Sequence, residues 1–247
     1  MKLDIQIILA NQILGRIACC TPKSSIGNIF RNAGYKHFIP DMQASIVERQ
    51  ISKTMDLRKM ELITMQVQQT LLKSFFMNYN PKADEPFFLY LSFMNPHDIC
   101  YGAGFDPRFP NKLRPHQIAA TQKYIELRKT LSDEEYRSQV PPVPGNTEPN
   151  GAYAEIKEIG SGSRNWTEEQ WAFYRWMYCR LVEDVEQQIG RVLAALKESG
   201  LADNTIVVFT SDHGEMNQSH GLVFKSQLLE EATRTPLIIS GPKVKKI

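Results

Sequence analysis

A long amphipathic pattern begins at Thr167 and ends before Gly200, with one apolar run earlier in the chain and another directly after it. Apolar side chains recur within the pattern every three or four residues, the period of a helix with one buried face. Thr167 and Gln170 have the spacing of a capping box, and Gly200 is a natural stop. The two runs, "FFLYLSFM" (87–94) and "TIVVFT" (205–210), have the composition of buried strands. Strand, helix and strand in this order predict an α/β fold with a mostly parallel sheet flanked by helices.

Ionisable side chains follow both predicted strands. Residues 210–225, "TSDHGEMNQSHGLVFK", contain Asp212, His213 and Lys225, and "NPHD" after the first strand contains His97. Ligands of parallel sheets bind beyond the carboxyl ends of the strands, where these residues lie. Lys225 would repel a bare metal ion. These residues can therefore form one site only if an anion lies between the metal and the Lys225 ammonium. We therefore expect these side chains to converge on one pocket.

Taken singly, each of these residues also has an ordinary structural explanation. Asp212 could cap the following turn, His97 could be a loop histidine with satisfied hydrogen bonds, and His220 could be a loop histidine packed on the strand. Asp212 and His213 are adjacent, so in a strand they would point to opposite faces. At the transition from strand to loop both can turn toward one ion, and Gly214 permits a sharp bend there.

Composition excludes several classes of protein. The net charge of +2 and the lack of a basic block argue against a nucleic-acid partner. No apolar run is long enough to cross a membrane, and Asp4 and Gln6 interrupt the one N-terminal stretch that could be a signal peptide. The cysteines contain no Cys-x-x-Cys pair, so neither a zinc knuckle nor a disulfide framework is evident: Cys19, Cys20, Cys100 and Cys179.

The segment "NTIVVFTSDHGEMNQSHGLVFKSQLLEEATRTPLIISGP" strongly resembles the C-terminal part of the sulfatase catalytic domain, in the alkaline-phosphatase-like superfamily. The resemblance extends back through "RLVEDVEQQIGRVLAALKESGL" and "EPFFLYLSFMNPHD", and more weakly to "IGNIFRNAGYK". It covers about residues 25 to 242. The resemblance implies an atypical N-terminal segment, 1–24, followed by a partial sulfatase catalytic domain, 25–247.

The resemblance also implies roles for the residues named above. Asp212 and His213 would bind a divalent metal, calcium first and manganese as the alternative. Lys225 would contact the sulfate, and His97 would contact the sulfate or assist the leaving group. The implied function is metal-assisted hydrolysis of the sulfate ester of a small molecule or glycan. A phosphonate or phosphodiester hydrolase of the same superfamily and a non-catalytic remnant are the alternatives, and intact relatives are often secreted or periplasmic.

The chain departs from the family at its N-terminus. The family opens with a strand that ends in paired Asp residues, and nothing like it is evident before residue 50. The family's nucleophile motif is Cys-x-Pro-Ser-Arg. Here "CTPKSS" has Cys20 and Pro22 but Lys23 and Ser24 in the next positions, so we interpret it as a coincidence. We expect an inactive internal piece whose sheet lacks its first strand and associates through the uncovered edge.

The remaining segments yield coarser predictions. "SIGNIFRNAGYKHF" and residues 57–78 have helical spacing of apolar residues. Residues 101–118 and 138–165 are rich in Pro, Gly, Asn and Ser, which predicts long surface loops where substrate choice would reside. "PLIIS", near the end, is a further short apolar run.

Overall fold

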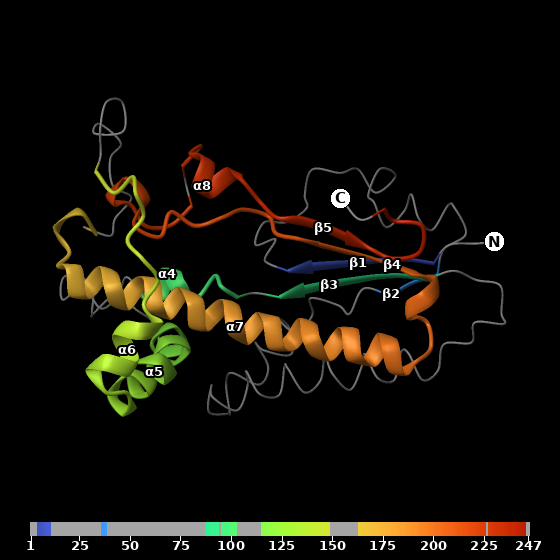
Figure 1. Ribbon diagram of the computed structural model, residues 1–247, viewed down its shortest axis with the longest axis horizontal. Helices are drawn as coiled ribbons and strands as arrows, with labels where there is room; N and C mark the ends of the chain where they lie inside the picture. The colour runs from blue at the N-terminus through green and yellow to red at the C-terminus, as the bar shows by residue number, and fades with distance from the viewer. Residues whose placement is uncertain are drawn as a thin grey trace. The chain divides into compact units, whose positions relative to one another are not determined.

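The computed structural model describes residues 4–10, 36–38, 87–93, 95–102, 115–148, 163–225 and 227–245 (Figure 1). Two helices expected from the sequence, in "SIGNIFRNAGYKHF" and in 57–78, lie outside these residues except for 36–38, which form a short strand. The chain divides into two compact units, each described separately below. The elements in chain order are β1 (Asp4–Ala10), β2 (Lys36–Phe38), β3 (Phe87–Phe93), α4 (Ile99–Gly102), α5 (Pro115–Thr130), α6 (Asp133–Gln139), η4 (Ser163–Asn165), α7 (Glu168–Glu198), η5 (Ala202–Asn204), β4 (Thr205–Thr210), η6 (Ser219–Gly221), α8 (Glu230–Thr233) and β5 (Leu237–Ser240).

The first unit is built on a five-stranded sheet in the order β2-β3-β1-β4-β5. It comprises Met1–Phe93, Glu186–Ser211 and Pro236–Ile247. Strand β1 pairs in parallel with β3 and with β4, and β2 pairs in parallel with β3. Strand β5 is antiparallel to β4. Together with the helices, this sheet confirms the α/β class expected from the sequence.

The expectation that the sheet lacks its first strand was wrong. Strand β1 lies in the middle of the sheet, with Ile7 opposite Tyr90 of β3 and Val208 of β4. Its sequence, "DIQIILA", contains the polar residues Asp4 and Gln6, which interrupt the apolar N-terminal stretch, so the pattern did not indicate a buried strand.

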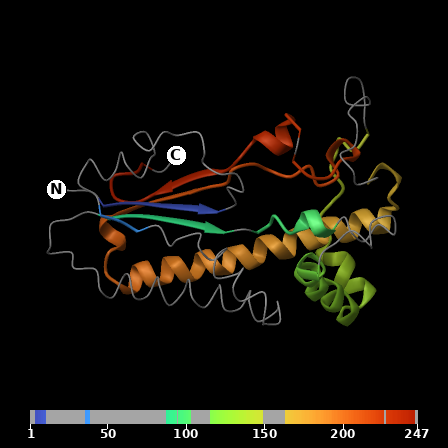
Figure 2. The ribbon, with the colours of Figure 1, turned by 180° about the vertical axis from the view of Figure 1, so that it is seen from behind.

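The C-terminal part of α7 covers one face of this sheet (Figures 1 and 2). Large side chains of β3 pack against apolar residues of the helix and of the turn that follows it, and all are less than 10% exposed. This cluster is the core of the first unit: Phe87, Leu89, Leu91, Val192, Leu196 and Leu201. Long apolar side chains at helical spacing thus become the inner face of α7, as the sequence predicts.

Strand β5 lies at the edge of the described sheet and exposes apolar side chains. Leu237, Ile238 and Ile239 are 66%, 58% and 47% exposed. An uncovered apolar edge of the kind expected is therefore found at β5 and not at a missing first strand. Association through such an edge stays a prediction.

The second unit comprises Met94–Val185 and Asp212–Thr235. It contains α4 to α6, the N-terminal part of α7, and α8. Its core is rich in aromatic rings, among which Trp166 packs against Trp171 and Tyr174 at centroid distances of 4.8 and 5.4 Å. The fully buried members with the largest side chains all come from α4 and α7: Ile99, Tyr174, Trp176, Met177 and Leu181.

The prediction of a capped helix from Thr167 is confirmed. The backbone N–H of Thr167 donates to Gln170 Oε1 at 2.8 Å, and the N–H of Gln170 donates to Thr167 Oγ1 at 3.3 Å. Gly200, with a φ of 74°, follows the end of the helix. No helix among the described residues has both the length and the apolar character needed to cross a membrane.

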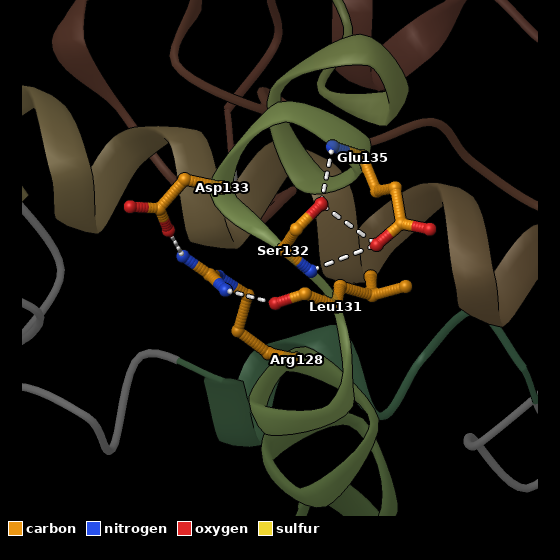
Figure 3. A network of polar contacts seen from close by, with 5 residues as sticks. All are labelled: Arg128, Leu131, Ser132, Asp133 and Glu135. Carbon is orange, nitrogen blue, oxygen red and sulfur yellow. Dashed lines mark hydrogen bonds and ion pairs between the residues drawn. The ribbon is translucent and has the colours of Figure 1, made fainter.

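The prediction of loops over 101–118 and 138–165 was wrong where α5 and α6 overlap them. Helix α6 begins with a capping box in which Ser132 Oγ accepts from the N–H of Glu135, and the Glu135 carboxylate accepts from the N–H of Ser132 (Figure 3). Arg128 donates to Leu131 O and to Asp133 Oδ1 and so ties α5 to α6. The Ser-x-x-Glu spacing at 132–135 is typical of a capping box and could have predicted the start of this helix.

Candidate anion and metal site

The turn after β3 holds His97 in a defined position. The Asn95 side-chain oxygen accepts from the N–H of Asp98 at 3.1 Å, and the carbonyl of His97 accepts from the N–H of Cys100 at 3.0 Å. The His97 ring lies edge-on to Tyr101, with centroids 6.0 Å apart. His97 is partly buried.

His97 and Lys225 are in direct contact, with Lys225 Nζ 2.8 Å from His97 Nδ1. The pKa of His97 is lowered to about 4, chiefly by burial and also by the neighbouring Lys225 and His213, against the opposing effect of Asp212. At neutral pH the imidazole is therefore uncharged. A lysine ammonium only donates, so Nδ1 accepts and the ring proton resides on Nε2. The pair offers N–H donors from both partners.

Replacement of Lys225 by Met is expected to raise the pKa of His97 above about 4, because a positive neighbour that disfavours protonation is removed. The pKa should stay below 6.5, since burial, the largest cause of the shift, remains. An NMR titration of the His97 imidazole resonances measures it. Lys123→Met, at a lysine that pairs with Asp184, is the control and should leave the pKa unchanged. An unchanged His97 pKa in Lys225→Met would contradict the contact.

Asp212 and His213 turn toward each other at the end of β4. His213 Nε2 lies 3.5 Å from Asp212 Oδ2, and His213 Nδ1 lies 2.9 Å from the carbonyl oxygen of Gly214. Donation from Nδ1–H to that carbonyl directs the Nε2 lone pair toward the carboxylate, the arrangement of histidine ligands in metal sites. Two ligands on one cation lie about 3 Å apart. The two side chains thus fit a shared divalent ion.

Among the described residues, no group of three or more His, Cys, Asp or Glu side chains could hold a metal. Asp212 and His213 therefore fit a cation as two of its ligands and do not complete a site by themselves. Calcium takes six to eight oxygen ligands, so the remaining positions would go to water, anion oxygens or other residues. An imidazole ligand also suits manganese.

Gly214 keeps the loop after β4 close to α8. Its N–H donates to the carbonyl of Ala232 at 2.8 Å, and a Cβ at this position would overlap the backbone carbonyl of Glu231. Glycine is needed at this position because the backbone of the loop approaches the backbone of α8 closely. The sharp bend proposed from the sequence is not the cause, since Gly214 is absent from the described residues with positive φ.

A buried carboxylate, Glu215, joins this loop to α7 and to the segment before Lys225. Its Oε1 accepts from the Tyr174 hydroxyl at 2.9 Å and from the N–H of Phe224 at 2.5 Å. Burial raises the pKa of Glu215, and the hydrogen bonds from Tyr174 and Phe224 and the charge of Lys225 counter it. Sequence reasoning missed Tyr174, which has the spacing of an ordinary core residue.

Contacts from other segments of the chain fix the rest of the loop that follows β4. The guanidinium of Arg175, 3% exposed, donates to Gln218 Oε1, to Glu168 Oε1 and to the carbonyl of Pro141. The N–H of His220 donates to the carbonyl of Asn146 at 2.7 Å. This backbone contact ties His220 to the segment around Asn146, and its packing on the strand, considered from the sequence, stays a prediction.

Neither described cysteine is an activated nucleophile. Burial raises the pKa of Cys100 to about 11 despite the nearby charge of Lys225, and burial also raises the pKa of Cys179. Both therefore remain thiols at neutral pH. Cys19 and Cys20 lie outside the described residues.

The predicted site residues of the second unit form two pairs: Lys225 contacts His97, and Asp212 contacts His213. Asp212 and His213 also act electrostatically on His97. The convergence of the two pairs on one pocket stays a prediction, as do the metal-binding and sulfate-binding roles.

Comparison with known proteins points to one family. The family profile described as "Sulfatase" matches residues 20–246. Arylsulfatase K of Danio rerio is 27% identical over 178 residues, which are 68% of this chain and 30% of the relative. A sulfatase of Formosa agariphila is 33% identical over 176 residues, with the same coverage of 68% and 30%. The chain thus spans less than a third of the length of these relatives.

Solved structures share the fold. A 2-O GAG sulfatase superposes with a TM-score of 0.59 at 20% identity, over 89% of this chain and 46% of that one. A structure from Bacteroides thetaiotaomicron, also described as a sulfatase, superposes with a TM-score of 0.53 at 25% identity, over 72% of this chain and 35% of that one. These likenesses agree with the alkaline-phosphatase-like fold implied by the sequence.

Proposed function

Because this chain belongs to the sulfatase family, we propose that Lys225, His97, Asp212 and His213 form a site for the sulfuryl group of a sulfate ester, the group that the family hydrolyses. The observation that carries the proposal is the contact between Lys225 Nζ and His97 Nδ1 at 2.8 Å. It places a cation beside a neutral imidazole whose Nε2 carries a proton. Both are donors, as an oxyanion requires.

Asp212 and His213 are the residues that would hold a divalent cation next to this pair, calcium first and manganese second. When bound, such a cation would neutralise charge on a sulfuryl oxygen. Lys225 contributes a second positive charge. Burial keeps the His97 imidazole neutral, so it can donate a hydrogen bond without adding a third positive charge. The substrate class is a sulfated small molecule or glycan, a class to which one structural relative points by its description as a 2-O GAG sulfatase.

Residues 25–247 make up the partial catalytic domain in this proposal, and 1–24 the atypical segment. The family profile begins at Cys20, so it includes "CTPKSS". Lys23 and Ser24 still stand where the motif has Ser and Arg, and we propose on that ground that the chain binds the group without turning it over.

The test is a titration of the full chain with inorganic sulfate in the presence of calcium, in which NMR monitors sulfate binding. Lys225→Ala and His97→Ala should each weaken sulfate binding about 10-fold or more, because each removes a hydrogen bond to a charged group. Lys123→Ala is the control. Sulfate affinity that is equal in all the variants would rule out this site.

The phosphonate or phosphodiester alternative has one supporting observation. A multifunctional alkaline phosphatase superfamily protein of Trinickia caryophylli is 30% identical over 156 residues. Competition with phenylphosphonate decides between the two. Displacement of sulfate by phenylphosphonate at much lower concentration than by phenyl sulfate would favour the alternative.

A further inference from the structure

The backbone of Phe224, the residue before Lys225, is held at both its N–H and its carbonyl. Phe224 donates its N–H to Glu215 Oε1 at 2.5 Å, and its carbonyl accepts from the N–H of Met216 at 2.9 Å. Glu215 is in turn fixed by Tyr174 of α7, whose hydroxyl lies 2.9 Å from the same oxygen. Glu215 is 9% exposed, so these bonds are shielded from water. A rigid connection therefore runs from α7 through Glu215 to the residue before Lys225.

Phe224 needs such a connection because its backbone is in a left-handed conformation, with a φ of 70°. A bulky residue adopts this conformation only when its surroundings impose it, at a cost of about 1 to 3 kcal/mol. The direction in which the chain leaves Phe224 decides where Lys225 begins. If the bond to Glu215 were lost, Phe224 would relax toward negative φ and Lys225 would leave His97.

We propose that Glu215, held by Tyr174, is the positioning residue that fixes the backbone at Phe224 and so sets the place of Lys225 beside His97 and the anion. Glu215 acts through Lys225 and does not touch the anion itself. The inference rests on the proposed function, because Lys225 has to be an anion contact for its placement to matter.

The test is a double-mutant cycle on the full chain with inorganic sulfate as the probe and thermal melting as the control for folding. Glu215→Ala should weaken sulfate binding about 10-fold, and Tyr174→Phe, which keeps the fold while removing one bond to Oε1, about 3-fold. In a Lys225→Ala background both changes should have less than about a 2-fold effect. Glu230→Gln, at an exposed carboxylate of α8, should change nothing in either background.

Glu215→Gln provides the rescue measurement. It keeps an oxygen for the N–H of Phe224 and the hydroxyl of Tyr174, so it should retain more sulfate affinity than Glu215→Ala. Equal losses in the wild-type and Lys225→Ala backgrounds, or a Glu215→Gln variant no better than Glu215→Ala, would overturn the inference and leave the proposed function intact. If Lys225→Ala alone has no effect on sulfate binding, the proposed function and the inference fail together.

Discussion

The purified chain is expected to release no phenol from an aryl sulfate above the uncatalysed rate, with or without calcium. Loss of a catalytic nucleophile lowers turnover by about 10⁴- to 10⁶-fold, even when the groups that bind the transition state remain. Both described cysteines have raised pKa values and remain thiols. Cys20 is followed by Lys23 and Ser24 in place of the family's Ser and Arg. We therefore expect the proposed site to bind the sulfuryl group and to lack the residue that would attack it.

The test measures the rate at which a chromogenic phenol is released from its aryl sulfate in the presence and absence of calcium. Cys20→Ala is the informative variant because the family profile begins at that residue. Metal-dependent turnover that disappears in Cys20→Ala, and persists in the matched Cys100→Ala variant, would show that "CTPKSS" is a working nucleophile motif. Turnover that survives both changes would identify a different nucleophile.

Gly214→Ala is expected to destabilise the chain by about 3 kcal/mol. A Cβ there would overlap the carbonyl of Glu231, a backbone atom that cannot swing aside as a side chain can. The hydrogen bond from the Gly214 N–H to the carbonyl of Ala232 would also be strained. Because Asp212 and His213 directly precede Gly214, sulfate and calcium binding should fall together with stability.

Urea denaturation of the two glycine variants measures the free energy of unfolding. Gly145→Ala is the matched control in the same unit, since a Cβ at Gly145 would have no atom within 4 Å. It should change stability by less than about 1 kcal/mol. Equal stability of the two variants would mean that the loop after β4 does not pack on α8 as described.

The parts of the fold that sequence reasoning predicted are those with a strong repeating signal. Helix α7 carries a long run of apolar residues at helical spacing and a cap at each end, and "FFLYLSFM" and "TIVVFT" became β3 and β4. "PLIIS" also became a strand, β5, although its antiparallel pairing could not be foreseen from so short a run. Periodic patterns survive in the structure because burial of one face gives them their stability.

The parts that it missed depend on partners distant in the chain. Strand β1 has polar residues at two of its seven positions, Asp4 and Gln6, and its place is decided by β3 and β4 on either side of it. In the candidate site, the residues with chemically distinctive side chains could be named: Asp212, His213, Lys225 and His97. The link from Tyr174 through Glu215 to Phe224 could not, because a tyrosine in an apolar stripe carries no sign of the loop that it meets.

The loop from Asp212 to Lys225 contains non-glycine residues in left-handed conformations, at Asn217, Gln218, His220 and Phe224. Gln218, His220 and Phe224 are held there by contacts with Arg175, Asn146 and Glu215, respectively. A synthetic peptide of this loop would relax out of this shape and lose the site, although it carries the whole recognisable motif. Grafting the function onto another scaffold would therefore require the helix face and the flanking segment that hold the loop, together with the loop itself.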